Sequence, residues 1–149
     1  MSTQKWIAGA ITYATISGMD TALNSLSNDA GILSSAQNNG TNLDMYADIV
    51  FNCAGHGTAP TADKTHDLYI VRSLDGGSTY EDSSDTRPPA YGSVGSFVLD
   101  NTAGAQVHVI PGVLLPPGYF KFRIINKSGY ALTASGHTVK WITYNQQVV

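Results

Sequence analysis

Cysteine and charge are scarce in this sequence of 149 residues. It contains one cysteine, Cys53, so an intrachain disulfide is impossible and a cysteine-rich zinc site is excluded. Lysine and arginine together number 8, charged residues make up 13%, and the formal net charge is -3. Because nucleic-acid binding needs a basic surface to neutralise phosphates, this composition argues against a nucleic-acid partner.

Long apolar runs are also missing. No run approaches the roughly 18 apolar residues of a membrane helix. The apolar start from Trp6 to Ile11 is followed by Thr12 and Tyr13, which interrupt the core that a secretory signal would need. We therefore expect no membrane partner and synthesis in a reducing cytoplasm.

Short segments of alternating apolar and polar residues make up most of the chain. The clearest covers residues 43–53, where the odd-numbered residues, from Leu43 to Cys53, face one way. The same period of two recurs in residues 120–124 and 138–144, each after a turn that contains glycine. The pattern predicts an all-β, antiparallel, jelly-roll-like sandwich of about eight strands.

Two segments depart from this pattern. Residues 19–26 predict one short helix, with Asp20 as its N-cap. Residues 1–17 are apolar and prone to β-structure, and they fit either an edge strand or an arm that pairs with a neighbouring subunit. We therefore expect an N-terminal strand or arm over residues 1–17 and a single sandwich domain over residues 18–149.

No set of residues has the spacing of a catalytic or metal-binding motif. The histidines His56, His66, His108 and His137 form no closely spaced pair, although folding could bring His56 and His66 together near an aspartate. Cys53 falls on the inward side of its strand, as an inert buried thiol would. The sequence thus predicts no enzyme, no cofactor and no metal.

Two segments are candidates for intermolecular contacts. The first is the apolar N-terminal segment, and the second is a long loop over residues 75–93, because long loops without periodicity often form binding surfaces. The expected contact residues are Trp6, Ile7, Ile11, Tyr13, Tyr80, Arg87 and Tyr91.

Several aromatic residues could also form a platform on which a sugar stacks. They are Trp6, Tyr13, Tyr80, Tyr91, Tyr119, Trp141 and Tyr144. Trp141 is better explained by core packing, given its position in its strand, whereas Tyr80 and Tyr91 are the more open candidates.

Two triplets, at Asn39 and Asn126, match the glycosylation sequon. Turns produce such triplets by chance, so these carry little weight.

Turn and core motifs in residues 20–145 resemble a family of small virion structural proteins of tailed bacteriophages. The motifs that carry this resemblance lie in residues 22–26, 42–48, 68–71 and 73–76 and in the later runs Leu115-Pro116-Pro117-Gly118, Asn126-Lys127-Ser128-Gly129, Ser135-Gly136-His137, and Trp141 with Tyr144-Asn145. The resemblance implies a decoration, or cement, protein that is made in the bacterial cytoplasm and binds the major capsid protein on the outside of the shell. A homo-oligomer, with a trimer favoured, would match the symmetry of such a lattice. The alternative is a tail- or fibre-associated sandwich that binds host glycans.

Overall fold

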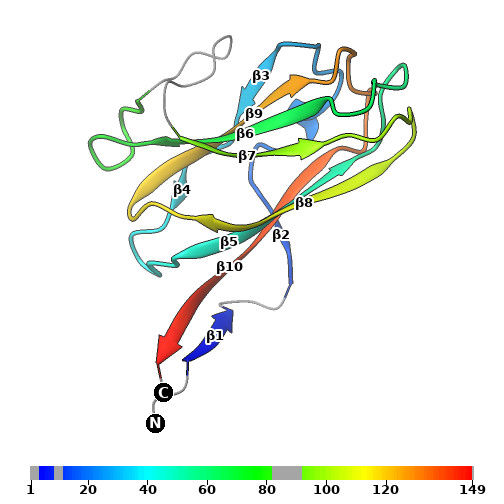
Figure 1. The fold of residues 1–149 in the computed structure, drawn as a ribbon. Coiled ribbons are helices and arrows are strands. Elements are labelled where there is room, and N and C mark those ends of the chain that lie inside the picture. The colour runs from blue at the N-terminus through cyan, green and yellow to red at the C-terminus, as the bar shows by residue number, and fades with distance from the viewer. Residues whose placement is uncertain (1–3, 9–11, 82–91, 149) are drawn as a thin grey trace.

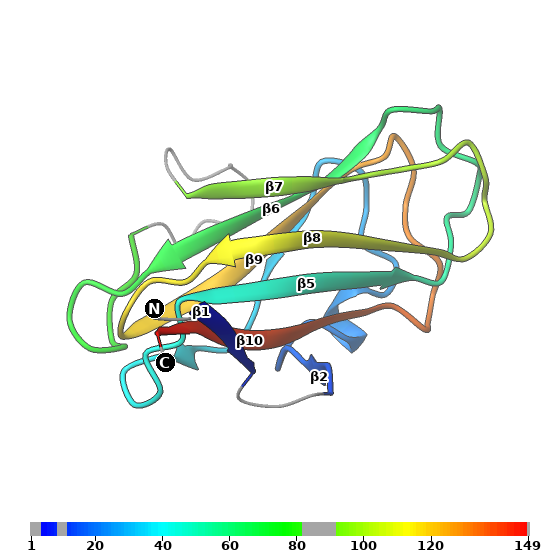
Figure 2. The same cartoon turned by 60° about the horizontal axis from the view of Figure 1, so that its bottom comes forward.

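The chain folds into two antiparallel β-sheets that face each other (Figures 1 and 2). The computed structural model describes residues 4–8, 12–81 and 92–148. Sheet A has the strand order β1-β10-β5-β8, with β2 also on β10, and sheet B has the order β3-β9-β6-β7, with β4 also on β9. The strands are β1 (Gln4–Ala8), β2 (Ala14–Thr15), β3 (Gly31–Leu33), β4 (Gln37–Asn38), β5 (Tyr46–Cys53), β6 (Thr65–Arg72), β7 (Ser93–Val98), β8 (Gln106–Leu114), β9 (Tyr119–Lys127) and β10 (Thr138–Val148).

The strand order is that of a jelly roll. β1 and β2 pair with successive parts of β10, and β3 and β4 pair with successive parts of β9. Two positions are thus each shared by two strands, so ten strands fill eight positions, four in each sheet. Eight positions arranged in two Greek keys define the jelly roll, which confirms the predicted sandwich.

The core lies between the sheets and is filled by inward side chains of the central strands, which are β10 and β5 in sheet A and β9 and β6 in sheet B. Phe120 and Phe122 of β9 are fully buried and point inward from sheet B. Trp141 of β10 meets them from sheet A, with its ring 5.6 Å from that of Phe122 and nearly perpendicular to it. Edge-to-face contacts of this kind stabilise aromatic pairs beyond the area they bury.

The predicted helix is nearly absent. Only Thr21–Leu23 forms a short 3₁₀ helix, and the side chain of Asp20 makes no capping hydrogen bond. Asn24 is extended and Ser25 has a left-handed backbone with φ of 57°, which ends the helix and lets Leu23 and Leu26 reach the core. None of the helical turns in the described residues is long and apolar enough to cross a membrane.

Strand ends also differ from the sequence-based expectation. The strand predicted over residues 43–53 begins only at Tyr46, and Leu43 and Met45 are exposed. The turn before it is held by Asn39, whose amide donates to the Asp44 carbonyl and accepts from the Asp44 N–H. β8 runs through Pro111 and Gly112 without a break, and Gly112 adopts a left-handed φ of 66° within the strand.

The two sequons are not available as surface acceptors. Asn126 is fully buried, and its amide donates to the carbonyls of Leu26 and Tyr130 and accepts from the Ser128 N–H. Asn39 is 6% exposed and holds the turn before β5. Both amides therefore serve to satisfy buried backbone groups.

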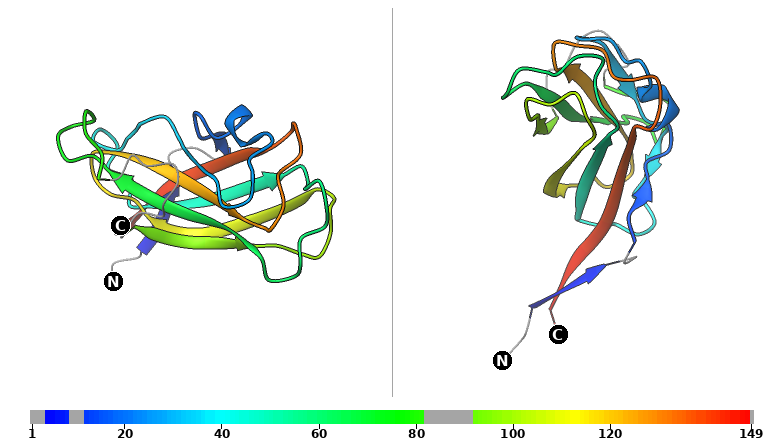
Figure 3. Two further views of the ribbon diagram at one scale, coloured as in Figure 1. Left: turned by 90° about the horizontal axis from the view of Figure 1, so that it is seen from above. Right: turned by 90° about the vertical axis from the view of Figure 1, so that its right-hand side faces the viewer.

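The described strands of the N-terminal segment pair within their own chain. β1 pairs with the last part of β10, from Tyr144 to Val148, whereas β5 pairs with β10 only as far as Tyr144. β1 and the end of β10 therefore form a two-stranded ribbon that extends beyond the body of the sandwich (Figure 3).

The contact between the sheets can be tested at Phe122. Replacing this fully buried ring by alanine should destabilise the protein by about 3–5 kcal/mol, because it removes apolar area and leaves a cavity. Urea unfolding followed by tryptophan fluorescence measures the change. Val107→Ala is the matched control, since this side chain is 66% exposed, and it should change stability by less than about 0.5 kcal/mol. Equal effects of the two substitutions would contradict the assignment of the core.

Candidate functional site: a tyrosine platform on sheet A

The outer face of sheet A carries aromatic and apolar side chains at its centre. Along β5 buried residues alternate with half-buried ones, so that Ala47 and Ile49 point into the core while Tyr46 and Asp48 point outward. On β10, Tyr144 lies opposite Tyr46 and Ile142 lies opposite Asp48. Residues directly opposite each other in an antiparallel pair share one face of the sheet, so these four side chains form a continuous surface.

Tyr46 and Tyr144 stack on each other across the strands. Their ring centroids are 5.8 Å apart and the ring planes differ by 24°. The hydroxyl of Tyr144 donates to Asp48 Oδ1 at 2.9 Å, and the Gly112 N–H donates to the same oxygen at 2.9 Å. Gly112 reaches Asp48 through its left-handed backbone, which glycine adopts without steric cost. Tyr144 is thus held by stacking against Tyr46 and by its hydrogen bond to Asp48.

Tyr13 extends this surface from the edge of the sheet. It directly precedes β2, whose Ala14 pairs with Trp141, so alternation places Tyr13 on the outer face beside Ile142. The Tyr13 side chain is 44% exposed. We call Tyr13, Tyr46, Asp48, Ile142 and Tyr144 the tyrosine platform.

The environment of Tyr144 keeps its hydroxyl protonated. Burial raises the pKa of Tyr144, and the hydrogen bond to Asp48, the charge of Asp48 and the proximity of Tyr13 raise it further. A protonated hydroxyl is the form that donates to the Asp48 carboxylate. The platform therefore presents a tyrosine ring in a fixed orientation rather than a titrating group.

An apolar groove adjoins the platform where β5 begins. Leu114 lies opposite Tyr46 on β8 and is 61% exposed, and Met45 directly precedes β5. Both line a groove of about 290 Å³ together with Leu43 and Pro117. Further along the same face, Val107 and Val109 of β8 are exposed. The surface thus combines aromatic and aliphatic area with a few polar groups, namely Asp48 on the platform and Asp44 and Arg72 in the groove, as small-ligand sites commonly do.

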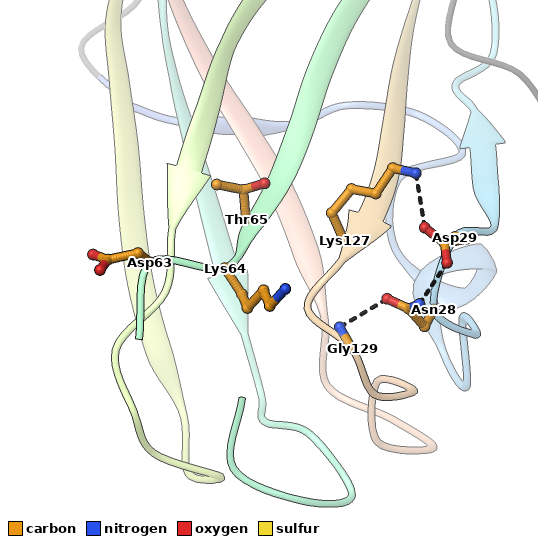
Figure 4. A pocket seen from close by; sticks show the side chains of 7 residues that line it. All are labelled: Asn28, Asp29, Asp63, Lys64, Thr65, Lys127 and Gly129. Atoms are coloured by element: carbon orange, nitrogen blue, oxygen red, sulfur yellow. Dashed lines mark hydrogen bonds and ion pairs between the residues drawn. The ribbon is translucent and has the colours of Figure 1, made fainter. Parts of the chain in front are cut away.

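A second, polar pocket lies at one end of sheet B (Figure 4). On one wall Lys127 Nζ lies 2.7 Å from Asp29 Oδ1, and Asn28 donates to Asp29 and accepts from the Gly129 N–H. Lys64 comes from the opposite wall. The polar groups of the first wall satisfy one another and no aromatic ring lines the pocket, so it offers less to an amphipathic ligand than the platform does.

Tyr80, one of the expected contact residues, lies away from the platform. Its ring packs under the Lys121 ammonium, 4.4 Å from the ring centroid, and its hydroxyl is buried. The preceding turn is closed by Asp75, which accepts hydrogen bonds from the Thr79 N–H and hydroxyl. This turn folds Tyr80 back against sheet B.

The other contact residues divide into three groups. Tyr13 joins the platform. Trp6 and Ile7 belong to β1, which pairs with β10. The remaining three, Ile11, Arg87 and Tyr91, lie outside the described residues.

Four residues of the platform, Tyr46, Asp48, Ile142 and Tyr144, were not among the expected contacts, and of these only Tyr144 was named as an aromatic candidate for sugar stacking. Tyr46 and Asp48 occupy the polar side of the alternation in residues 43–53, and that alternation was the available signal. Their partners on β10, Tyr144 and Ile142, are about 100 residues away in the sequence, so the sequence pattern could not predict that these side chains meet.

Comparisons with known proteins give matches among solved structures alone. No protein-family model and no curated protein matches the chain. A CBM36-1 domain of a multidomain xylanase from the hindgut metagenome of Trinervitermes trinervoides is 12% identical, with 97% of each chain covered and a TM-score of 0.39. A carbohydrate-binding module CBM36 in complex with calcium and xylotriose is 15% identical, with 100% of this chain and 99% of that chain covered and a TM-score of 0.39. A CBM35 from Paenibacillus barcinonensis is 15% identical, with 97% and 91% covered and a TM-score of 0.37.

These matches correct the function expected from the sequence. The three structures named above are carbohydrate-binding modules and not virion proteins, so the expectation of a capsid decoration protein is wrong. The motifs that suggested it are turn and core residues such as Pro116, Pro117 and Gly118. Such residues are required by the turns of a β-sandwich, so they carry information about the fold and not about the ligand.

Among the described residues, no three carboxylates lie close enough together to share an ion. The one group of three His, Cys, Asp or Glu side chains found there close enough to share an ion is Cys53, His56 and His66. It contains no carboxylate, whereas calcium takes oxygen ligands. No role for calcium is therefore assigned to the platform.

The coupling of Tyr144 to Asp48 can be tested by alkaline titration. The difference in tyrosinate absorbance between the wild type and Tyr144→Phe should show a transition above the ordinary tyrosine pKa of 10.0. Asp48→Asn should move that transition to lower pH, because it removes the negative charge beside the hydroxyl. Since the folded state holds this proton more tightly, its contribution to stability should be lost as pH rises above about 10. An unchanged transition in Asp48→Asn would contradict the coupling.

Proposed function

We propose that the chain is a non-catalytic β-sandwich module that binds carbohydrate on the tyrosine platform. The observation that carries this proposal is the gathering of Tyr13, Tyr46 and Tyr144 around Asp48 on the outer face of sheet A. Glycan binding was also the alternative function expected from the sequence.

The chemistry of the platform suits a sugar ring. A pyranose has an apolar face of C–H groups and a rim of hydroxyls, so it needs an aromatic surface with hydrogen-bonding groups at its edge. Tyrosine supplies both, because its ring is apolar and its hydroxyl is polar. Asp48 Oδ1 already accepts from Tyr144 and Gly112, and a carboxylate has further lone pairs with which to accept from a sugar hydroxyl.

The shape of the site suits an extended oligosaccharide. The outward residues of β5 run from Tyr46 to Asn52, which corresponds to roughly 20 Å at the usual rise of a strand. The groove beside Met45 and Leu114 continues the surface at one end. Exposed Val109 lies opposite Val50 and adds apolar area along the same face.

Binding without catalysis follows from the composition of the platform. Glycoside hydrolysis by the usual mechanisms requires two carboxyl groups, one on each side of the scissile bond. The platform itself contains one carboxylate, that of Asp48, which positions Tyr144, and the carboxylate of Asp44 in the adjoining groove accepts a hydrogen bond from Asn145. We accordingly assign the site recognition and no bond cleavage.

Glycan binding can be tested with the full chain on two sets of ligands. One set is bacterial cell-surface polysaccharides, the host glycans of the alternative expected from the sequence, and the other is β-1,4-linked oligosaccharides, xylotriose among them. Tyr46→Ala and Tyr144→Ala should each weaken binding to the recognised glycan by about tenfold, equivalent to about 1.4 kcal/mol of lost contact. Calorimetric titration or affinity electrophoresis measures the change.

Tyr130→Ala is the matched control for these substitutions. Tyr130 is 41% exposed but lies outside the platform, so its removal should leave the affinity unchanged. Circular dichroism checks that each variant is folded. Failure to bind any member of either set, or an equal loss in Tyr130→Ala, would overturn the proposal. Release of reducing sugar by the wild type would show an enzyme instead.

A further inference from the structure

Three buried side chains with metal-binding atoms converge at the far end of β5. They are Cys53, His56 and His66, and their sulfur and nitrogen atoms all lie within 4.8 Å of one another. Cys53 is the last residue of β5 in sheet A, His66 belongs to β6 in sheet B, and His56 lies in the connection between the two strands. Each of the three residues is at most 3% exposed. The cluster therefore links the two sheets inside the protein.

The two imidazoles point their Nε2 atoms at each other. The distance between His56 Nε2 and His66 Nε2 is 3.1 Å, so that one ring donates a hydrogen bond to the other, and the ring planes differ by 5°. In a tetrahedral zinc site, two nitrogens at about 2.05 Å from the ion lie about 3.3 Å apart, and a thiolate sulfur lies about 3.6 Å from each. The two nitrogens thus already have nearly the spacing of zinc ligands, and an ion would replace the hydrogen bond between them. The sulfur, which lies within 4.8 Å of the ligand nitrogens, needs to move by up to roughly 1.2 Å.

The hydrogen bonding of this cluster is incomplete. His56 Nδ1 is buried and has no partner among the described residues. Whichever ring nitrogen of His56 carries the proton, either a donor or an acceptor at Nδ1 is left unsatisfied, which is costly inside a protein. Residual buried polar atoms of this kind often mark a functional site or an ion.

We propose that Cys53, His56 and His66 bind one zinc-class transition-metal ion. A thiolate and two imidazoles form a ligand set that Zn²⁺ and Cu⁺ prefer, whereas Mg²⁺ and Ca²⁺ take oxygen donors. On binding, the Cys53 thiol gives up its proton to solvent and its sulfur becomes a ligand. Three protein ligands leave one position of the tetrahedron to water.

The protonation states of the imidazoles agree with this assignment. Burial, with a smaller contribution from neighbouring histidines, lowers the pKa of His66 to about 3, and burial also lowers the pKa of His56. Both rings are then neutral near pH 7, which is the form that binds metal.

The two other histidines are engaged elsewhere. His137 Nδ1 accepts from the Ala54 N–H, and His137 Nε2 lies 3.0 Å from the Thr133 carbonyl oxygen. His108 Nε2 lies 3.0 Å from Gln106 Oε1. Neither ring belongs to the group of side chains close enough to share an ion, so the site is limited to three side chains among the described residues.

An ion at this position would stabilise the fold by joining sheet A to sheet B. Because the unfolded chain does not hold the three ligands together, the ion binds the folded state and raises its stability by mass action. The site is separate from the platform, since Tyr46 and Cys53 occupy opposite ends of β5, roughly 23 Å apart along the strand. Loss of either site is therefore expected to leave the other intact.

The test uses the full chain, freed of metal by a chelator and kept reduced. Zn²⁺ at 100 times its dissociation constant should raise the Tm by about 5–10 °C, and Mg²⁺ should not raise it. Native mass spectrometry should find one zinc ion per chain. Co²⁺, used as a spectroscopic probe, should give the intense thiolate-to-cobalt absorption that requires a sulfur ligand.

Variants separate the cluster from nonspecific binding. Cys53→Ala should abolish the thiolate-to-cobalt band, and His56→Gln should lose the shift in Tm, while His108→Gln should keep both. Should either of the first two variants fail to fold, the wild-type measurements decide alone. A wild type with no zinc-dependent shift and no thiolate-to-cobalt band would overturn the proposal, and so would an equal shift in a folded Cys53→Ala variant.

Discussion

The packing of one sheet face against the other is the constraint on which the rest of this structure depends. β9 and β10 lie inside their sheets, and their inward residues, among them Phe122 and Trp141, meet at the centre of the core. A strand that sends one residue inward must send the next one outward. Once the inner faces are filled, the outer faces are fixed as well, down to the individual residue.

The tyrosine platform is a consequence of that alternation. Tyr46 points outward because the next residue of β5, Ala47, points into the core. Tyr144 follows Thr143 in β10, which lies opposite Ala47, so Tyr144 points outward as well. What distinguishes this surface from an ordinary polar face is that Asp48 fixes Tyr144, with Gly112 holding the carboxylate from the other side. A preorganised aromatic surface loses little conformational freedom when a ligand binds, which favours recognition.

β5 serves both sites because it spans the whole sandwich. Its beginning carries Tyr46 and Asp48 on the outer face, and its end carries Cys53 on the inner face, where the connection to β6 brings His56 close to His66. The first arrangement is open to a large polar ligand. The second is enclosed and holds nitrogen and sulfur donors, which suit a small ion. One strand can support both because its two faces meet different environments.

The sequence by itself determined the two-layered fold and which residues of most strands point inward. Both follow from the alternation of apolar and polar residues within short segments. It indicated Tyr13 and Tyr144 as aromatic candidates but not their meeting with Tyr46, and it did not indicate the function, since turn residues reflect the fold. Only the tertiary structure decided that β8 continues through Gly112, that residues 19–26 give up helix for core packing, and that Asp48 meets a hydroxyl 96 residues away. The physical reason is that strands pair through backbone hydrogen bonds, which do not depend on the identity of the side chains. Which side chains become neighbours across a sheet is therefore set by the register of the whole fold.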